Sequence, residues 1–391
     1  MPTLPPYDKI KQFFPYHRKE LVKTLLLLLQ CISISGTVCL YKNCNSAGHA
    51  TGNSKLPKAR VYKTLIRFFC MKCTDAFCLG LIYLIINVLS LDNCIFIVMD
   101  RTNWKIGKTN INILYIGLLL PNGSFIPILF DVLDKRGNSS STERKCILGR
   151  FCELWQQNGQ QKPVLLADRE FVGIEWFKCI VNAGFSLVIR IRSKDYFNEL
   201  CRQQNTQIDE MRAEIAKKVS NQGYFSAPIL LDECHFYYVA LPNSAPKNLE
   251  TDEPYLFFIT DNPDAQAAGE QYRKRWKIEV FFFNIKTNGF NVENINFKNP
   301  KKIQLMLAIL AFLYAIIQKK HLDNPPNIKD KIFKHNTTKS ISIFRSSYDN
   351  FKLKVLTINH LLKYINQILR HFIPPNQHAF RHCEYIYKKN G

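Results

Sequence analysis

Acidic residues are scarce in this sequence. Of its 391 residues, 31 are Asp or Glu and 53 are Lys or Arg, which gives a formal net charge of +22 at pH 7. Such an excess of positive charge favours a polyanionic partner, either nucleic acid or an anionic membrane surface. The length suits one large domain with insertions, or two to three domains.

Uninterrupted apolar runs long enough to cross a membrane are also lacking. The run 21–40 contains Lys23, Gln30 and several Ser and Gly residues, and the run 77–91 is only about 15 residues long, short of the roughly 20 that a spanning helix needs. Both runs are expected to be core helices. The sequence therefore predicts no membrane association.

The 13 cysteines form no compact framework, and the N-terminus has no signal-peptide pattern. We expect reduced thiols in a cytoplasmic protein. A zinc site would need four spaced ligands. The candidate groups are each incomplete: Cys39 with Cys44, Cys70 with Cys73, and His378 with His382 and Cys383.

No repeats, low-complexity tracts, helix-turn-helix or zinc-finger patterns are present, so DNA contact has to be judged from charge. Residues 1–95 carry 12 basic and 4 acidic side chains, and residues 291–391 carry 17 and 5, which leaves only +2 for the middle. Residues 55–72 interleave basic and apolar side chains as an amphipathic helix does. That face could bind DNA phosphates or simply be solvated.

Two apolar runs in the middle of the chain end in an acid. Residues 94–100 end in Asp100, and residues 163–168 end in Asp168. Both read as buried central strands, and side chains at strand ends can converge at one edge of a sheet. Further strands are expected at 111–120, 125–132, 185–191, 225–231, 235–241 and 255–260, with helices at 21–40, 142–157, 175–183, 265–288, 303–320 and 355–373 and a polar linker at 43–58.

The stretch 272–286 places four polar side chains in an otherwise apolar run: Tyr272, Arg275, Glu279 and Lys286. At 100° per residue their offsets fall within about 100° of arc, on one helical stripe. A helix that is apolar elsewhere is expected to be buried, and its carboxylate then needs cations or a metal. The alternative to a functional site is an Arg275–Glu279 ion pair that only stabilises a core helix. For Trp276 and Trp104, packing in the core is favoured over stacking on DNA bases.

The spacing Tyr272-x2-Arg275-x3-Glu279-x6-Lys286 resembles the Y-x2-R-x3-E-x6-K signature of DDE transposases from bacterial insertion sequences of the insertion-sequence-4 type. Further blocks resemble that family in the same order: 100–104, 138–140 and 167–171. The resemblance covers roughly residues 95–320.

The resemblance implies an α/β fold: a ribonuclease-H-like mixed-sheet catalytic core with an inserted subdomain and helical flanks. The expected domains are a basic, helical, DNA-binding region at 1–92, a core at 93–192 and 254–320, an insertion at 193–253, and a basic helical region at 321–391.

The resemblance also implies a chemistry. Asp100, Asp168 and Glu279 would be the catalytic, metal-binding triad, and Tyr272, Arg275 and Lys286 would contact DNA. Carboxylate oxygens suit Mg²⁺ or Mn²⁺, and two ions could promote in-line phosphoryl transfer. The expected enzyme cleaves transposon ends and transfers the freed strand into target DNA.

The implied partners are double-stranded DNA, as terminal inverted repeats and as target, and a second copy of the chain in a synaptic homodimer. The implied location is cytoplasmic, on the nucleoid. Two alternatives stay open: a decayed or repurposed transposase that only binds DNA, and a ribonuclease-H-like nuclease without strand transfer.

Overall fold

The chain divides into two compact units. The computed structural model describes residues 6–89, 91, 94–158, 163–243, 253–323, 325, 330–333, 336–339 and 342–369. The first unit, here the helical unit, comprises Met1–Leu91, Asn103–Ile111 and Phe281–Gly391, and the second, the sheet unit, comprises Asp92–Thr102 and Asn112–Val280.

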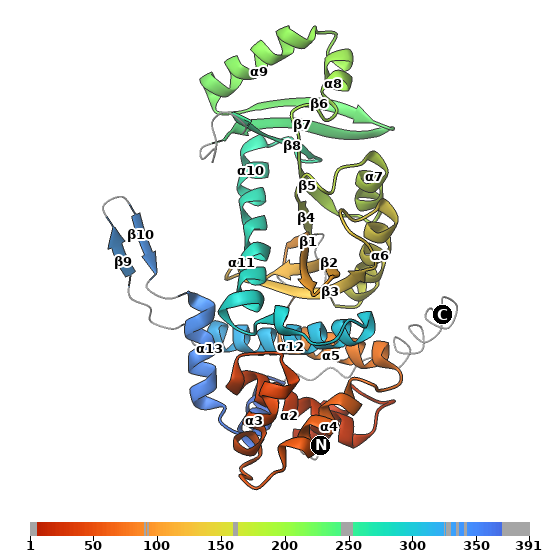
Figure 1. Ribbon diagram of the computed structural model, residues 1–391. Helices are drawn as coiled ribbons and strands as arrows, with labels where there is room; N and C mark the ends of the chain where they lie inside the picture. Colours follow the sequence, from red (N-terminus) through yellow and green to blue (C-terminus); the bar gives the residue numbers. More distant parts are fainter. Residues whose placement is uncertain are drawn as a thin grey trace. The chain divides into compact units, whose positions relative to one another are not determined.

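An eight-stranded mixed sheet, in the order β3-β2-β1-β4-β5-β8-β7-β6, organises the fold (Figure 1). β1 pairs with β4 and β4 with β5 in parallel, whereas β2–β3, β5–β8, β8–β7 and β7–β6 are antiparallel. This confirms the expected α/β fold with a mixed sheet. The strands are β1 (Phe96–Ile106), β2 (Thr109–Leu119), β3 (Phe125–Leu133), β4 (Val164–Ala167), β5 (Ser186–Ile191), β6 (Phe225–Leu231), β7 (Cys234–Pro242) and β8 (Tyr255–Thr260).

The central strands follow from their composition. The first five residues of β1 are all buried, as are the last three of β4, which is the pattern of parallel strands covered on both faces. A tight turn connects β2 and β3. The Leu120 backbone N–H donates to the Ser124 carbonyl at 2.9 Å there, and Gly123 adopts φ 78°, a left-handed conformation that glycine adopts without steric cost.

Helices cover both faces of the sheet. α6 (Ser141–Asn158) and α7 (Ile174–Asn182) lie along one face and α10 (Ala265–Arg273) along the other (Figure 1). The start of α6 is set by a capping pair, in which the Ser140 backbone N–H donates to Glu143 at 2.6 Å and the Glu143 N–H donates to the Ser140 hydroxyl at 3.3 Å.

The segment between β5 and β8 adds to the same sheet. It contains α8 (Phe197–Gln203) and α9 (Ile208–Gln222), followed by β6 and β7, and β7 pairs with β8. The strands expected at 225–231 and 235–241 are therefore confirmed.

The helical unit packs around two apolar helices, α5 (Thr74–Val88) and α12 (Pro300–Asp323). By length and composition alone α12 could cross a membrane, but 78% of its apolar window is buried inside the protein, which is the pattern of a core helix. The other elements of this unit are α1 (Pro6–Lys11), α2 (Lys19–Ser35), α3 (Leu40–Thr51), α4 (Lys58–Phe68), β9 (Asp330–Phe333), β10 (Asn336–Lys339), α13 (Ile343–Lys354) and α14 (Ile358–Ile368).

Two expectations for the N-terminal part are wrong. The helix expected at 21–40 ends at Ser35, because Gly36 takes a left-handed conformation that closes it. The polar linker expected at 43–58 is largely α3. Asn43 is fully buried in that helix, where its amide donates to the Thr37 carbonyl at 3.1 Å and accepts from the Ser35 hydroxyl at 2.7 Å, so a polar composition concealed a packed helix.

The C-terminal helix is described only in part. α14 lies within the expected range 355–373, and residues from 370 onward fall outside the described part of the chain. The incomplete group of His378, His382 and Cys383 lies there too.

Candidate active site

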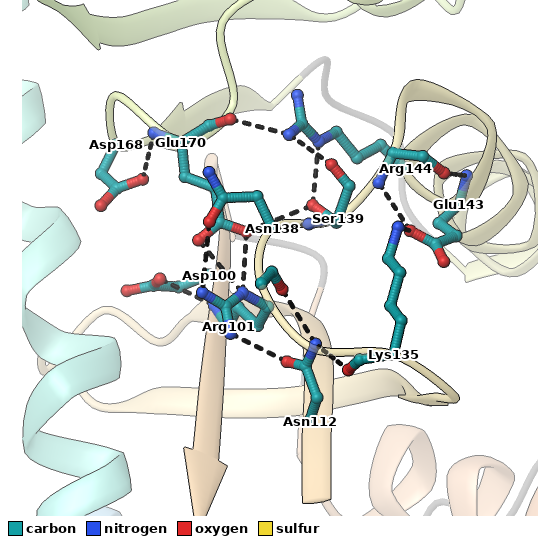
Figure 2. A network of polar contacts seen from close by, with 12 residues as sticks. Asp100, Arg101, Asn112, Lys135, Asn138, Ser139, Glu143, Arg144, Asp168 and Glu170 are labelled. Carbon is teal, nitrogen blue, oxygen red and sulfur yellow. Dashed lines mark hydrogen bonds and ion pairs between the residues drawn. The ribbon is translucent and has the colours of Figure 1, made fainter. Parts of the chain in front are cut away.

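Two acidic side chains lie at neighbouring positions on adjacent parallel strands. The register pairs Val98 of β1 with Leu166 of β4, so Asp100 and Asp168, each two residues further on, are level with each other. Asp168 directly follows the last residue of β4, as expected. Asp100 does not end its strand, because β1 continues to Ile106. Figure 2 shows both carboxylates on the same side of a network of polar contacts.

Asp100 is buried and fully engaged. One of its carboxylate oxygens accepts the Arg101 backbone N–H at 2.7 Å, and the other accepts from the Arg275 guanidinium at 2.9 Å. Arg275 also forms an ion pair with Glu279, one helical turn away. The guanidinium therefore bridges Asp100 and Glu279, with exposed side-chain fractions of 12%, 12% and 33% for Arg275, Asp100 and Glu279.

The negative charges of Asp168 and Glu279 act on the carboxyl group of Asp100. Burial raises the pKa of Asp100 to about 7, Arg275 opposes that rise, and the negative charges of Asp168 and Glu279 add to it. Burial alone would lower the pKa of Arg275, but Tyr272, Asp100 and Glu279 together raise it above its ordinary value. The site thus concentrates negative charge, and Arg275 supplies a compensating cation.

The donor set fits a divalent cation, although the described side chains do not form a closed cage. Among the residues that the structure describes, no three His, Cys, Asp or Glu side chains are grouped so that they could hold a metal ion. Asp100 and Glu279 both contact Arg275, and Asp100 and Asp168 provide hard oxygen donors at neighbouring positions. Burial is the main cause of the raised pKa of Asp100, and a divalent cation would relieve the smaller contribution that comes from repulsion by Asp168 and Glu279.

The helix that carries Glu279 is not one regular α-helix, which corrects the expectation for 265–288. α10 is followed by a 3₁₀ turn at Lys274–Trp276, then by α11 (Lys277–Phe283) and a π-helical segment at Asn284–Asn288. A uniform 100° per residue does not apply across these changes, so a single stripe cannot be assumed.

The predicted DNA-binding residues fall in both units. Tyr272 and Arg275 belong to the sheet unit, where the Tyr272 ring packs against Phe258 at 4.8 Å and the guanidinium carbon of Arg275 lies 5.6 Å from the Tyr272 ring centre. Lys286 belongs to the helical unit. Its ammonium donates to the Asn103 carbonyl at 3.0 Å and lies 3.3 Å from a Glu293 carboxylate oxygen.

The burial expected for this helix holds on only one side. Ile278 and Phe281 are buried, but Trp276 and Phe283 are 56% and 58% exposed. The core position expected for Trp276 is therefore wrong. Trp104 is buried, as expected.

Sequence reasoning gave no role to two residues beside the aspartates. Arg101 follows Asp100 directly, Glu170 follows Asp168 by two positions, and their side chains form a part-buried ion pair. The available signal was a basic residue after one aspartate and an acidic residue near the other, and charge signs alone do not show which groups meet.

A family model described as the transposase DDE domain matches residues 96–316. No curated protein sequence matches the chain. Among solved structures, the chain is similar to one described as piggyBac transposase in a synaptic complex with hairpin DNA, with a TM-score of 0.47 and 10% identity over 97% of this chain and 84% of that chain. The family match spans Asp100, Asp168 and the stretch 272–286.

The raised pKa of Asp100 predicts a pH-dependent stability in metal-free protein. The folded carboxyl holds its proton up to about pH 7, whereas an unfolded Asp loses it near pH 3.9. The folded state therefore binds more protons across this window, and the free energy of unfolding falls as the pH rises. Asp100→Asn removes this effect. The free energy of unfolding of the variant minus that of wild type should therefore rise by on the order of 2 kcal/mol from pH 5 to pH 8.

Urea unfolding in the presence of a chelator at pH 5, 6, 7 and 8 measures this difference. Asp134→Asn, which removes an exposed carboxyl, is the control. A difference between wild type and Asp100→Asn that does not change with pH, or that changes in the opposite direction, would contradict the proposed burial of Asp100 among like charges.

Proposed function

This protein belongs to the transposase DDE domain family, whose model matches more than half of the chain, and we propose that it cleaves DNA at transposon ends and joins the freed 3′ ends to target DNA in a metal-dependent reaction. The observation that supports this most strongly is the grouping of Asp100 and Asp168 on adjacent strands, with Glu279 linked to Asp100 through Arg275. The proposed origin is a bacterial insertion sequence of the insertion-sequence-4 type.

We assign metal binding to Asp100, Asp168 and Glu279, with Mg²⁺ or Mn²⁺ as the cation and two ions as the proposed number. When bound, such ions would activate the attacking hydroxyl and stabilise the leaving oxygen at phosphorus. The parallel pairing of β1 and β4 holds the two aspartates level, so their carboxylates are already in place before DNA arrives. Glu279 joins them only if Arg275 gives up its ion pair with that side chain.

Arg275 is the residue that couples the carboxylates to a phosphate. Its guanidinium lies between Asp100 and Glu279 and contacts each carboxylate through one nitrogen, and a planar guanidinium released from these carboxylates can bind a phosphate in a bidentate manner. Tyr272 and Lys286 complete the proposed DNA contacts. Lys286 would leave the Asn103 carbonyl and Glu293 for a neighbouring phosphate.

Basic surfaces support DNA as the partner. In α4 the apolar residues Val61 and Leu65 are buried, whereas Lys58, Arg60, Lys63 and Arg67 are exposed along the same helix. We propose that this face contacts phosphates of the terminal inverted repeats. A homodimer would pair two ends, and the protein would act in the cytoplasm, on the nucleoid.

A cleavage and strand-transfer assay tests the proposed function. The substrate is DNA that carries the element's own ends, with Mg²⁺ or Mn²⁺, and the comparison is between wild type and Glu279→Gln. The variant should bind the ends as wild type does but cleave at least about 100-fold more slowly, because it lacks a carboxylate that holds the cations. Glu270→Gln, at an exposed position of α10, is the matched control.

Each outcome of that assay has a distinct meaning. Cleavage without joining by wild type would favour a nuclease. If wild type and both variants bind the ends specifically and none of them cuts, the chain is a DNA-binding remnant and the catalytic assignments fail.

The charge distribution predicts a steep salt dependence of DNA binding. If six or more phosphates are contacted, affinity should fall by about 10³-fold or more between 50 and 200 mM salt. Replacing both Lys63 and Arg67 by Gln should lower the slope of log affinity against log salt by about 2, since each lost phosphate contact removes roughly 0.9.

Fluorescence anisotropy with chelated metal measures both quantities. An unchanged slope in this double variant would remove α4 from the interface, and a flat response in wild type would rule out phosphate-dominated binding.

A further inference from the structure

The two aspartates are each held by the backbone of a neighbouring residue. Asp100 accepts the Arg101 N–H at 2.7 Å, and Asp168 accepts the Glu170 N–H at 2.9 Å (Figure 2). Each hydrogen bond restricts how far its carboxylate can rotate. The residues that supply them, Arg101 and Glu170, therefore influence the direction in which the two carboxylates point.

The side chains of these same two residues meet. The Arg101 Nε lies 2.9 and 3.1 Å from the two carboxylate oxygens of Glu170, and the exposed fractions of the side chains are only 14% and 13%. A continuous chain of contacts therefore runs from Asp100 through Arg101 and Glu170 to Asp168. We call the Arg101–Glu170 pair the clamp.

Arg101 is fixed by further partners. Its Nη1 donates to the Asn112 side-chain oxygen at 2.9 Å, and its Nη2 reaches that of Asn138 at 3.4 Å. Asn112 in turn donates to the carbonyls of Lys135 and Gly137 at 3.1 and 3.0 Å. A part-buried guanidinium with this many partners is confined to few rotamers, and Lys could not replace it at equal cost.

Glu170 also has several hydrogen-bond partners. One of its carboxylate oxygens also accepts the Ser139 backbone N–H at 3.2 Å, and its own carbonyl accepts from Arg144 at 2.7 Å. By composition, Glu170 could compete with Asp168 as a metal ligand. Its carboxylate oxygens instead contact Arg101. Glu170 therefore influences the site through Asp168, which accepts its backbone N–H.

We propose that Arg101 and Glu170 are positioning residues that hold the Asp100 and Asp168 carboxylates at one separation and orientation, so that a divalent cation meets a pre-arranged pair of donors. This rests on the metal-dependent function proposed above. Partners of ligating groups tune metal sites because they remove rotational freedom from the ligands. The pairing of β1 with β4 fixes the backbone positions of the two aspartates, and the clamp fixes the orientation of their carboxylates.

Mn²⁺ binding to the DNA-free, full-length chain tests this without requiring cleavage. Electron paramagnetic resonance counts free Mn²⁺ during a titration of wild type, Glu170→Gln, Glu170→Asp and Arg101→Lys. Glu170→Gln and Arg101→Lys should each bind Mn²⁺ about 10- to 100-fold more weakly, while Glu170→Asp, which keeps the charge, should recover part of the loss. DNA affinity measured in chelator should not change.

Glu175→Gln is the matched control. It makes the same substitution five residues further on, in an exposed pair with Lys145 at 3.1 Å, and should bind Mn²⁺ as wild type does. Circular dichroism confirms that each variant is folded. If Glu170→Gln does not fold, the Mn²⁺ titrations of Arg101→Lys and Glu170→Asp test the clamp instead.

Three results would overturn the clamp. One is wild-type Mn²⁺ affinity in both Glu170→Gln and Arg101→Lys. Another is loss of binding in Glu170→Gln with no change in Arg101→Lys, which would make Glu170 a direct ligand. The third is a wild-type chain that binds no Mn²⁺, which would overturn the proposed function as well. A wild type that binds Mn²⁺ but cuts no DNA would contradict the proposed function alone and leave this comparison valid.

Discussion

The ion pairs of Arg275 are the interaction on which the site depends. Asp100 lies in the middle of a buried strand, where an uncompensated carboxylate would cost several kcal/mol. Arg275 supplies the compensating charge to Asp100 and to Glu279 together. Removing one partner of such a pair typically destabilises a protein by about 3–5 kcal/mol. Arg275 therefore offsets part of the cost of burying Asp100 when no cation is bound, and it leaves Glu279 paired with Arg275 until another charge replaces it.

Two sets of contacts thus act on the same carboxylates. Arg101 and Glu170 constrain the aspartates from residues adjacent to them in sequence, whereas Arg275 reaches Asp100 from a helix 175 residues later. The first set consists of hydrogen bonds of 2.7 to 3.1 Å between groups that all have partners. The second contains an exchangeable ion pair. This division suits the proposed metal site, in which Asp100 and Asp168 would stay in place while Glu279 and Arg275 change partners when DNA binds.

The sequence predicted most of the sheet, because its buried strands correspond to short apolar runs that end at turn residues or acids. It was less successful where tertiary contacts decide. The burial of Asn43 turned a polar stretch into α3. The extension of β1 past Asp100 could not be read from polar residues such as Arg101 and Asn103. The 3₁₀ and π segments around Glu279 have no composition that marks them. For the site, spacing and family resemblance drew attention to the aspartates and Glu279, but the Arg101–Glu170 pair joins residues 69 positions apart, which only the fold brings together.

Anomalous diffraction from crystals of the full chain grown with Mn²⁺ tests the central claim most directly. The account predicts a strong manganese peak bounded by the carboxylates of Asp100 and Asp168, with Glu279 released from Arg275 and the Arg101–Glu170 pair unchanged. Manganese bound elsewhere, with Arg275 still bridging Asp100 and Glu279, would contradict it.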